Sequence, residues 1–271
     1  MRMCRNWPVS VCSWSFQQDI EQVAEHMKSM DIGYVNLALL PALQGDRNAY
    51  IDFAKNHDWI ISATMINFPC EDYSTLDRIK VTGGLAPDDA WEENKQLALG
   101  AIDLTAELDT EYLLMHFGFI DHADPAYVTK FYDRTRLLAD AAAEKGVKFL
   151  METGQETAAE LEHFLKENNH PALTVNFDPA NMILYNKGVP VEAIEVLASW
   201  VRHIHIKDAT RTKTPGEWGA EVPWGDGEVG TDAFLSKLEA IGYKGAVAIE
   251  REAGDDRPGD IRLAAERLSQ F

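Results

Sequence analysis

The sequence predicts an α/β protein, a single (β/α)8 TIM-barrel domain over residues 1–271, and three observations support this prediction. Eight short apolar runs of strand length alternate along the chain with amphipathic runs of helix length. The length fits one such barrel, which usually takes about 250 residues. No linker or low-complexity tract divides the chain. An open doubly wound sheet is the alternative, but no GxGxxG fingerprint follows the first apolar run.

The first half of the chain supplies four of the predicted strand and helix pairs. Apolar residues such as Ile20, Val23 and Met27 recur at helical spacing and form one stripe on the first helix. A loop rich in glycine and proline precedes the third helix of this half. The predicted strands are 9–15, 32–38, 59–68 and 111–117, and the predicted helices are 17–30, 46–57, 88–108 and 125–145.

The second half repeats the same alternation four more times. Gly146 stands where a glycine often ends a helix. The apolar runs here are nearly continuous, as expected for parallel strands that are buried on both faces. A long polar loop follows the third strand of this half. The predicted strands are 147–152, 172–178, 201–207 and 246–250, and the predicted helices are 156–168, 189–200, 231–241 and 258–270.

The overall composition narrows the possible functions. The formal net charge is −19 and the sequence pI is about 4.7, so a nucleic-acid partner is not expected. The three cysteines are an odd number without CxxC spacing, which predicts free thiols in a reducing, cytoplasmic environment. No apolar run reaches the roughly 18 residues of a membrane span, so no membrane partner is expected.

Each of the last four predicted strands carries an acidic residue or a histidine at or near its end. A carboxylate in such a place is costly unless something compensates its charge. The carboxyl ends of barrel strands surround one site, and neighbouring strands lie about 4.8 Å apart. We therefore expect one divalent metal ion, Mn²⁺, Co²⁺, Mg²⁺ or Zn²⁺, rather than four unrelated surface residues. The predicted ligands are Glu152, Asp178, His205 and Glu250.

Six short segments resemble the sugar (phosphate) isomerase/epimerase family of xylose isomerase-like TIM barrels. Each segment is short, and their order and spacing are specific to the superfamily but not to one substrate. The resemblance covers most of the chain and is strongest from about residue 147 to residue 252. The segments are METGQE, NFDPAN, HIHIKDATR, EVPWGDGEVG, GYKG and AIERE.

The resemblance implies the same four metal ligands and adds further residues. It places the metal on the second histidine of the HxH segment, which is His205, and implies a substrate contact by Arg211, six residues later. Two positions depart from the ketose 3-epimerases. Asn181 stands where they have a histidine, and Ala158 stands where they have a second glutamate. Glu156 either replaces that glutamate or begins the next helix, and both Asn181 and Glu156 are candidate substrate contacts.

Glu152 and Glu250 are also the predicted catalytic acid and base. The metal would polarise a carbonyl, and one glutamate would remove the neighbouring carbon-bound proton to give a cis-enediolate. Return of the proton gives epimerisation or aldose–ketose isomerisation, and loss of a β-hydroxyl gives dehydration. The predicted function is a metal-dependent isomerase or epimerase of a sugar or sugar-like ketone. A dehydratase (lyase) of an inosose- or dehydroshikimate-type substrate is the alternative.

Three more candidate substrate contacts each have an alternative structural role. Lys207 either binds a substrate oxygen or pairs with Asp208 or another neighbour. His116 faces either the pocket or the barrel wall. Trp14 packs either on a sugar face or in the barrel core.

Two further expectations concern packing and a lid. His203, two residues before His205, is expected to be a hydrogen-bonded core histidine. The loop after residue 207 carries Trp218 and Trp224, which are candidates for a lid.

Two other functions compete with these. The endonuclease IV branch of the fold needs several more histidine ligands and a surface that attracts DNA. A non-catalytic sugar-binding barrel would be expected to have a broken metal quartet. The expected partner is therefore a small sugar or polyol ketone, and a homo-oligomer is compatible with the sequence.

Overall fold

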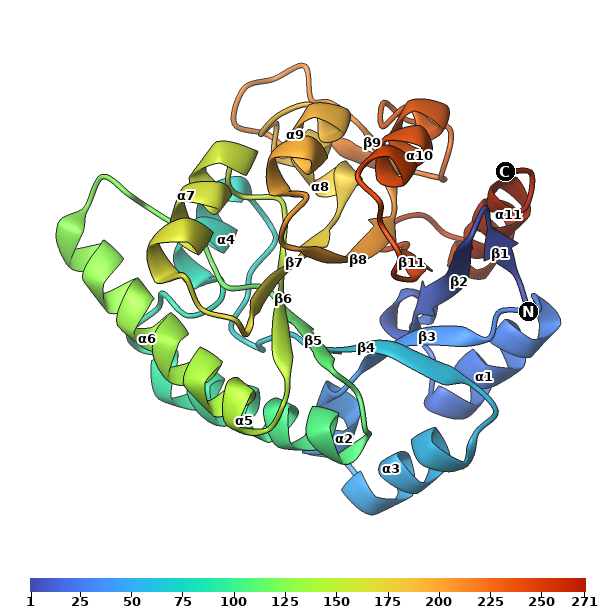
Figure 1. Cartoon of the computed structure of the whole chain (residues 1–271), viewed down its shortest axis with the longest axis horizontal. Coiled ribbons are helices and arrows are strands. Elements are labelled where there is room, and N and C mark those ends of the chain that lie inside the picture. The colour runs from blue at the N-terminus through green and yellow to red at the C-terminus, as the bar shows by residue number, and fades with distance from the viewer.

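Eight parallel strands close into a ring in the computed structural model, which describes residues 1–271 (Figure 1). The strand β2 pairs with β3 on one side and with β11 on the other, so the first and last barrel strands meet. This closure confirms the predicted barrel and excludes the open sheet. The barrel strands are β2 (Trp7–Cys12), β3 (Tyr34–Ala38), β4 (Ile60–Ile66), β5 (Tyr112–Met115), β6 (Lys148–Glu152), β7 (Leu173–Phe177), β8 (Val201–Ile206) and β11 (Val247–Ile249).

Helices surround the ring (Figure 1). Their first turns are set by local sequence: Asp19 and Thr157, for example, each form a capping box with the residue three positions later. The helices are α1 (Ile20–Ser29), α2 (Leu40–Gln44), α3 (Arg47–Asn56), α4 (Leu76–Thr82), α5 (Trp91–Glu107), α6 (Pro125–Glu144), α7 (Ala158–Asn168), α8 (Pro179–Leu184), α9 (Pro190–Leu197), α10 (Thr231–Ala240) and α11 (Arg257–Leu268).

The structure differs from the sequence prediction in several short elements. The first barrel strand ends at Cys12, and Ser13–Phe16 form a 3-10 turn, which the Ser13 hydroxyl ties to β3 by accepting from the Ala38 N–H at 2.9 Å. The short helices α2, α4 and α8 lie in segments predicted as loops or left unassigned. The polar loop after β8 contains the two-stranded ribbon β9 (Asp208–Thr210) and β10 (Ala220–Val222), and β1 (Met3–Cys4) extends the sheet at β2. These elements are too short for side-chain periodicity to reveal.

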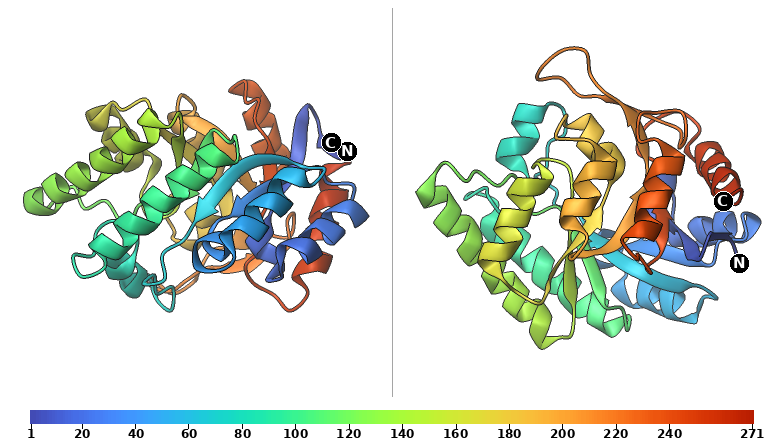
Figure 2. Two further views of the ribbon diagram at one scale, coloured as in Figure 1. Left: turned by 90° about the horizontal axis from the view of Figure 1, so that it is seen from below. Right: turned by 45° about the horizontal axis from the view of Figure 1, so that its top comes forward.

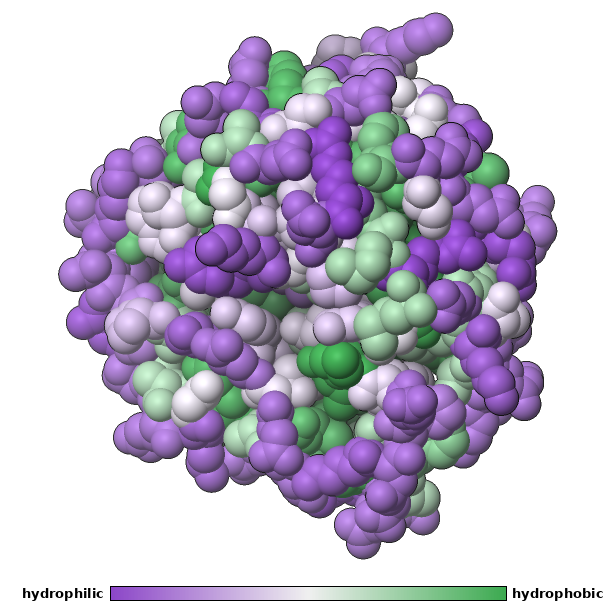
Figure 3. Space-filling model, turned by 45° about the vertical axis from the view of Figure 1, so that its right-hand side comes forward, coloured by the Kyte–Doolittle hydropathy of each residue, from purple (hydrophilic) through white to green (hydrophobic).

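The two chain ends lie close together (Figures 1 and 2), and the face of the molecule shown in Figure 3 is mainly hydrophilic. Both termini lie on the same side of the molecule, near α1 and α11 (Figures 1 and 2). Hydrophilic residues cover most of the face shown in Figure 3, and apolar residues form small separate patches on it. None of the helices combines the length and the apolar character that crossing a membrane requires.

Two hydrophobic clusters position the site. The larger cluster has 65 buried residues drawn from the strands and the helices around them. A second cluster consists of Ala38, Ala63, Met65, Leu114 and Leu150, on β3 to β6. Trp14 packs against this second cluster and also lines the cavity described below. The cavity therefore rests on a packed, apolar floor on this side of the barrel.

Candidate metal centre and cavity

Four side chains converge from the ends of four neighbouring barrel strands. Glu152 ends β6, Asp178 follows β7 and caps α8, His205 lies in β8, and Glu250 follows β11. One nitrogen or oxygen atom from each lies within 4.8 Å of those of the other three. The side chains of Asp178 and His205 are fully buried, and that of Glu152 is 19% exposed. The structure thus brings together all four residues that the sequence singled out.

His205 stands at the centre of the group. Its Nδ1 lies 3.0 Å from Glu152 Oε1, 3.2 Å from Glu250 Oε2 and 3.8 Å from Asp178 Oδ2. Its Nε2 faces the opposite way, 3.3 Å from the Asn36 amide nitrogen and 3.6 Å from Cys12 Sγ. Nδ1 is therefore the nitrogen directed at the carboxylates.

Asn36 determines which nitrogen of His205 carries the proton. Its Oδ1 is buried without a partner, while its Nδ2 contacts His205 Nε2. The oxygen and nitrogen of an amide are assigned from their hydrogen-bond partners. Turning the Asn36 amide by half a turn exchanges the two atoms, so that Oδ1 accepts a hydrogen bond from Nε2–H. The lone pair of Nδ1 then points at the carboxylates, as a metal ligand requires.

The donor set fits a divalent cation. Asp178 Oδ2 and His205 Nδ1 are both buried and lack a hydrogen-bond partner, although buried polar atoms usually have one. The other oxygen of Asp178 accepts from the backbone N–H groups of Ala180 and Asn181, which fixes the carboxylate. Three carboxylates and one imidazole suit Mg²⁺, Mn²⁺, Co²⁺ or Zn²⁺.

The two glutamates have different surroundings. Burial raises the pKa of Glu152, and the neighbouring Glu250 and Asp178 raise it further. Burial also acts to raise the pKa of Glu250, but His205 and Lys207 outweigh it and hold this pKa well below its usual range. Opposite displacement of two carboxyl pKa values is typical of sites that need one acid and one base.

Lys207 is the cation of the site. Its side chain is 3% exposed, and its Nζ donates to Glu250 Oε2 at 2.9 Å and to Glu252 Oε2 at 2.6 Å. The alternative pairing with Asp208 is not observed. The Asp208 carboxylate instead accepts from the backbone N–H groups of residues 209, 225, 227 and 229, and so anchors the loop after β8.

A cavity of about 590 Å³ opens next to these residues. Glu152, Glu250 and Lys207 line one part of it. Four aromatic residues also line it, which gives flat apolar walls next to polar groups, as in many small-molecule sites. They are Trp14, Tyr73, Tyr185 and Trp218.

Three of the remaining candidates lie at the cavity. Trp14 donates from its indole nitrogen to Glu250 Oε1 at 2.9 Å, and its ring is 6.0 Å from that of His205. Asn181 lines the cavity 3.4 Å from the Lys207 ammonium. His116 lines it as well, and its Nδ1 lies 3.0 Å from Glu71 Oε1.

Arg211 and Glu156 lie outside the cavity lining, contrary to their expected role. The Arg211 guanidinium donates to Asn186 Oδ1 at 3.1 Å and to the Gly188 carbonyl at 2.6 Å, so it is occupied in the outer loops. Glu156 does not begin α7, since Thr157 caps that helix. Its carboxylate accepts from the Ile120 N–H at 3.1 Å, and burial raises its pKa to about 7.

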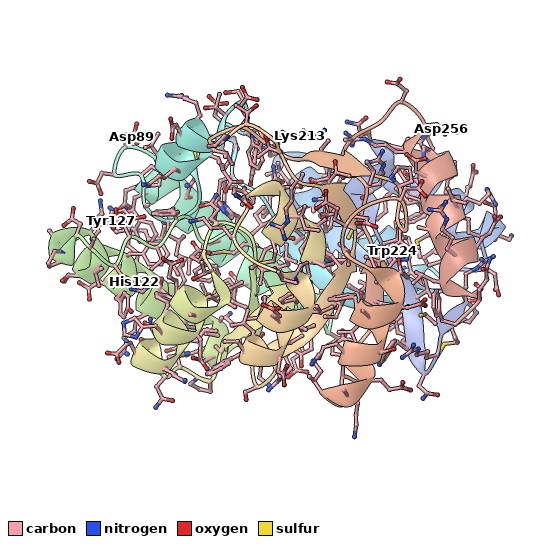
Figure 4. The ribbon with its side chains drawn as sticks, turned by 90° about the horizontal axis from the view of Figure 1, so that it is seen from above. Asp89, His122, Tyr127, Lys213, Trp224 and Asp256 are labelled. Carbon is pink, nitrogen blue, oxygen red and sulfur yellow. The ribbon has the colours of Figure 1, made fainter.

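The ribbon β9–β10 contributes part of the cavity wall. Trp218 lines the cavity and packs edge-on against Tyr185, with ring centres 4.7 Å apart. Trp224 is 3% exposed and packs against Phe234, so it is a core residue and not part of a lid. In Figure 4 the loop that carries Lys213 lies at the edge of the molecule, whereas Trp224 lies against its body.

His203 is a hydrogen-bonded core histidine, as expected. Its Nδ1 is 2.9 Å from Asn176 Oδ1 and its Nε2 is 3.3 Å from Ser62 Oγ. Burial lowers the pKa of His203, so the ring is neutral. The Asn176 amide in turn donates to Glu152 Oε1 at 3.3 Å, which links the barrel interior to the site.

Several cavity residues were not identified from the sequence. Glu252 lies two positions after Glu250, so the segment AIERE carried a signal for it. Glu221 comes from β10, where it binds the buried Arg251 at 2.6 Å. Glu71 and Tyr73 come from the loop after β4, and no local pattern marks them. Only the closed ring brings these segments together.

The comparisons with known proteins agree with this architecture. The family model described as xylose isomerase-like TIM barrel matches residues 20–271. Over 121 residues the chain is 31% identical to the uncharacterized protein YihM of Escherichia coli, an alignment that covers 44% of this chain but only 34% of YihM. The crystal structure of a xylose isomerase domain protein from Planctomyces limnophilus is 29% identical, with a TM-score of 0.88, over 98% of this chain and 96% of that one.

More distant structures share the fold. A D-allulose 3-epimerase from Methylomonas sp. has 17% identity and a TM-score of 0.72, over 98% of this chain and 97% of that chain. A probable 3-DHS dehydratase, AsbF, from Bacillus anthracis has 16% identity and a TM-score of 0.73, over 96% and 98% of the two chains. Together with the match of the family model over residues 20–271, the barrel and its motifs confirm the resemblance: the chain belongs to the xylose isomerase-like TIM barrel family.

Proposed function

We propose that the protein is a divalent-metal-dependent isomerase or epimerase that acts on a sugar or a sugar-like ketone. The observation that carries this proposal is the convergence of Glu152, Asp178, His205 and Glu250 within 4.8 Å, with two buried ligand atoms left without partners. A D-allulose 3-epimerase and an L-ribulose 3-epimerase are among the solved structures that share the fold, which supports the proposal.

The four residues would hold the metal ion, and the two glutamates would also transfer protons. A divalent ion bound there would polarise a substrate carbonyl and acidify the neighbouring C–H group. Glu152 and Glu250 stand on β6 and β11, which two strands separate, so their carboxylates approach the site from different directions. One takes the carbon-bound proton and the other delivers a proton. The raised pKa of Glu152 and the lowered pKa of Glu250 support this division of roles.

The cavity favours a neutral polyhydroxy substrate. Glu71, Glu221 and Glu252 line it in addition to the two metal-site glutamates, and they would repel phosphate or carboxylate groups. The Lys207 ammonium, already shared by Glu250 and Glu252, would orient a substrate oxygen together with Asn181. Trp14 and Trp218 offer flat apolar surfaces to the C–H face of a sugar.

Dehydration is the second candidate. It uses the same proton abstraction but needs an additional acid to protonate the departing hydroxyl. His116 lines the same cavity and supplies a group of this kind. Product analysis separates the two reactions, because dehydration lowers the product mass by one water and isomerisation leaves it unchanged.

The test measures metal content and carbon-bound proton exchange together. Elemental analysis of the purified protein should find about one divalent ion per chain. In D₂O, D-allulose, D-fructose or an inosose should gain deuterium at carbon. Glu152→Gln and Glu250→Gln should each lower kcat about 10²–10⁴-fold. The exposed Glu266→Gln is the matched control and should behave like the wild type.

Two results would contradict the proposal. One is a protein that takes up no divalent ion on titration. The other is unchanged turnover in both glutamine variants, which would remove the assigned acid and base.

A further inference from the structure

A second polar pair lies in the cavity, outside the metal quartet. Glu71 comes from the loop after β4, and His116 directly follows β5. Their side chains are 2% and 13% exposed, and His116 Nδ1 is 3.0 Å from Glu71 Oε1. The Glu71 carboxylate also accepts the backbone N–H groups of Phe68 at 3.2 Å and Gly84 at 3.1 Å. These contacts hold the carboxylate next to Nδ1 of the imidazole.

The surrounding backbone is shaped around the His116 ring. A Cβ atom at Gly83 would lie 2.8 Å from His116 Cε1, so only glycine leaves room for the imidazole there. Gly84 has a φ of +65°, which lets its N–H reach Glu71. The centre of the Tyr73 ring lies 6.2 Å from that of the imidazole. The orientation of His116 is therefore set by the fold.

His116 lines the cavity, and one of its two ring nitrogens has no partner in the protein. The oxygens of the Glu71 carboxylate accept from two backbone N–H groups, and the one that faces His116 accepts from Nδ1–H, so Nδ1 carries the proton. Nε2 is buried and has no partner. Met115 pairs with Met151 across β5 and β6, which places the next residues, His116 and Glu152, level with each other. An unpartnered imidazole nitrogen beside a catalytic glutamate calls for a substrate atom as its partner.

We propose that His116, oriented by Glu71, is a further catalytic residue that exchanges a proton with a substrate oxygen at Nε2. This inference rests on the proposed function, since both groups act on one substrate. The arrangement has the logic of a carboxylate–imidazole pair in which the carboxylate orients the ring and stabilises its cation. Glu152 and Glu250 handle the proton on carbon, and His116 handles the proton on oxygen.

The proton balance is simple. The neutral imidazole takes the proton of a substrate hydroxyl: the O–H bond breaks, the Nε2–H bond forms, and Glu71 offsets the new positive charge. In isomerisation the same proton then passes to the carbonyl oxygen that becomes a hydroxyl. In dehydration the ring instead starts protonated and gives its Nε2 proton to the departing β-hydroxyl, whose C–O bond breaks to release water. The ring then takes a proton from solvent, and the glutamate that removed the carbon-bound proton gives one up to solvent. Epimerisation at one carbon moves no oxygen-bound proton, so the pair favours the other two reactions.

The electrostatics agree with this role. Burial acts to lower the pKa of His116, but the hydrogen bond and the charge of Glu71 outweigh it, so the pKa lies above its ordinary value. The raised pKa makes the ring a stronger base, as removal of a proton from a substrate hydroxyl requires.

The test compares two readouts in the magnesium-loaded protein with the substrate panel named above. One readout is deuterium incorporation at the substrate carbon in D₂O, and the other is product formation. His116→Gln should keep the carbon exchange and lose product formation by about 10²–10⁴-fold. His122→Gln, a histidine outside the cavity lining, is the matched control.

Glu71→Gln keeps the size of the side chain and one oxygen, which can still accept from the Gly84 N–H group, whereas the hydrogen bond from the Phe68 N–H group to the second oxygen is lost. Its thermal unfolding is compared with that of the wild type to show that it folds. It should lower kcat less than His116→Gln does. It should also shift the acid limb of the plot of kcat against pH to lower pH, which a merely structural role would not do.

Each contrary outcome has its own meaning. Product formation at the wild-type rate in His116→Gln overturns the role of His116 and leaves the proposed function standing. Loss of exchange and product together, with unchanged thermal unfolding, also overturns the oxygen role. A wild-type protein that exchanges no carbon-bound proton with any of the sugars removes both proposals.

Discussion

The two halves of the barrel rim are built from different chemistry. β6, β7, β8 and β11 carry Glu152, Asp178, His205 and Glu250 at or next to their carboxyl ends, whereas β2 to β5 end in Cys12, Ala38, Ile66 and Met115. The four later barrel strands, β6, β7, β8 and β11, concentrate charge around one point. The four earlier strands, β2 to β5, present mostly apolar side chains that pack as a floor. His116, immediately after β5, stands at the border between them.

This contrast shows how the barrel places an expensive group of charges. Three carboxylates can be buried together only where cations and N–H donors surround them. Lys207, the backbone at Asp178 and a metal ion would supply these on the charged side. The ends of β2 to β5 carry no such charges, and their apolar side chains would keep water away from a bound substrate, which would strengthen the electrostatic interactions.

The largest change in stability is expected when the cation that offsets the carboxylates of the charged side is removed. Lys207→Met leaves Glu250 and Glu252 without their buried cation. In metal-free buffer it should lower the free energy of unfolding by about 3–5 kcal/mol, measured by urea denaturation. Lys237→Met, which removes an exposed pair with Glu195, is the matched control and should cost less than about 1 kcal/mol. Equally small losses of unfolding free energy in the two variants would contradict this prediction and show that the carboxylates at the cavity are well solvated.

A second prediction concerns a buried carboxyl that belongs to neither group. The pKa of Glu156 is raised by burial from 4.5 to about 7, so the folded protein holds this proton more tightly than the unfolded chain does. The resulting stabilisation is complete below pH 4.5 and is lost as the pH rises through about 7. At pH of about 8, Glu156→Gln should therefore be more stable than the wild type by up to roughly 3 kcal/mol.

Urea denaturation at several pH values measures this effect. The difference between Glu156→Gln and the wild type should shrink as the pH falls. The exposed Glu167→Gln should show no such trend. A constant difference at every pH would mean that Glu156 is not a buried acid in solution.

A third prediction tests a link across the two halves. Asn36 lies on β3, in the apolar half, but contacts the nitrogen of His205 that faces away from the quartet. Asn36→Leu should weaken Mn²⁺ binding about 10–100-fold in calorimetric titration, because the imidazole loses the acceptor that fixes its tautomer. Cys12→Ala should have a smaller effect, since sulfur is a weak hydrogen-bond partner. Equal losses in the two variants would assign the effect to packing.

The smallest effect is expected outside both halves. Arg211 binds Asn186 and Gly188 in the outer loops. Arg211→Gln should leave kcat/KM at the wild-type level and cost less than about 1 kcal/mol of stability. A large rise in KM would show that the side chain turns into the cavity when substrate binds.

Much of this architecture could be predicted from local patterns. The eight barrel strands and their helices follow from periodicity, because the two alternating periods differ along the whole chain. The convergence of Glu152, Asp178, His205 and Glu250 could be predicted because each stands at an equivalent place in an apolar run, a position where an isolated charge is costly. Short elements such as α4 and the ribbon β9–β10 were missed, since they depend on caps and on pairing partners that are distant in sequence.

The sequence by itself determined the barrel, the family and the four convergent residues. Only the tertiary structure decided the surroundings of those residues. Glu71 meets His116 across 45 positions of sequence, and Lys207 meets Glu252 instead of its neighbour Asp208. The physical reason is that hydrogen bonding, desolvation and charge pairing depend on distance in space. A residue's neighbours in space are fixed only when the ring of strands closes and sets the register of every strand end.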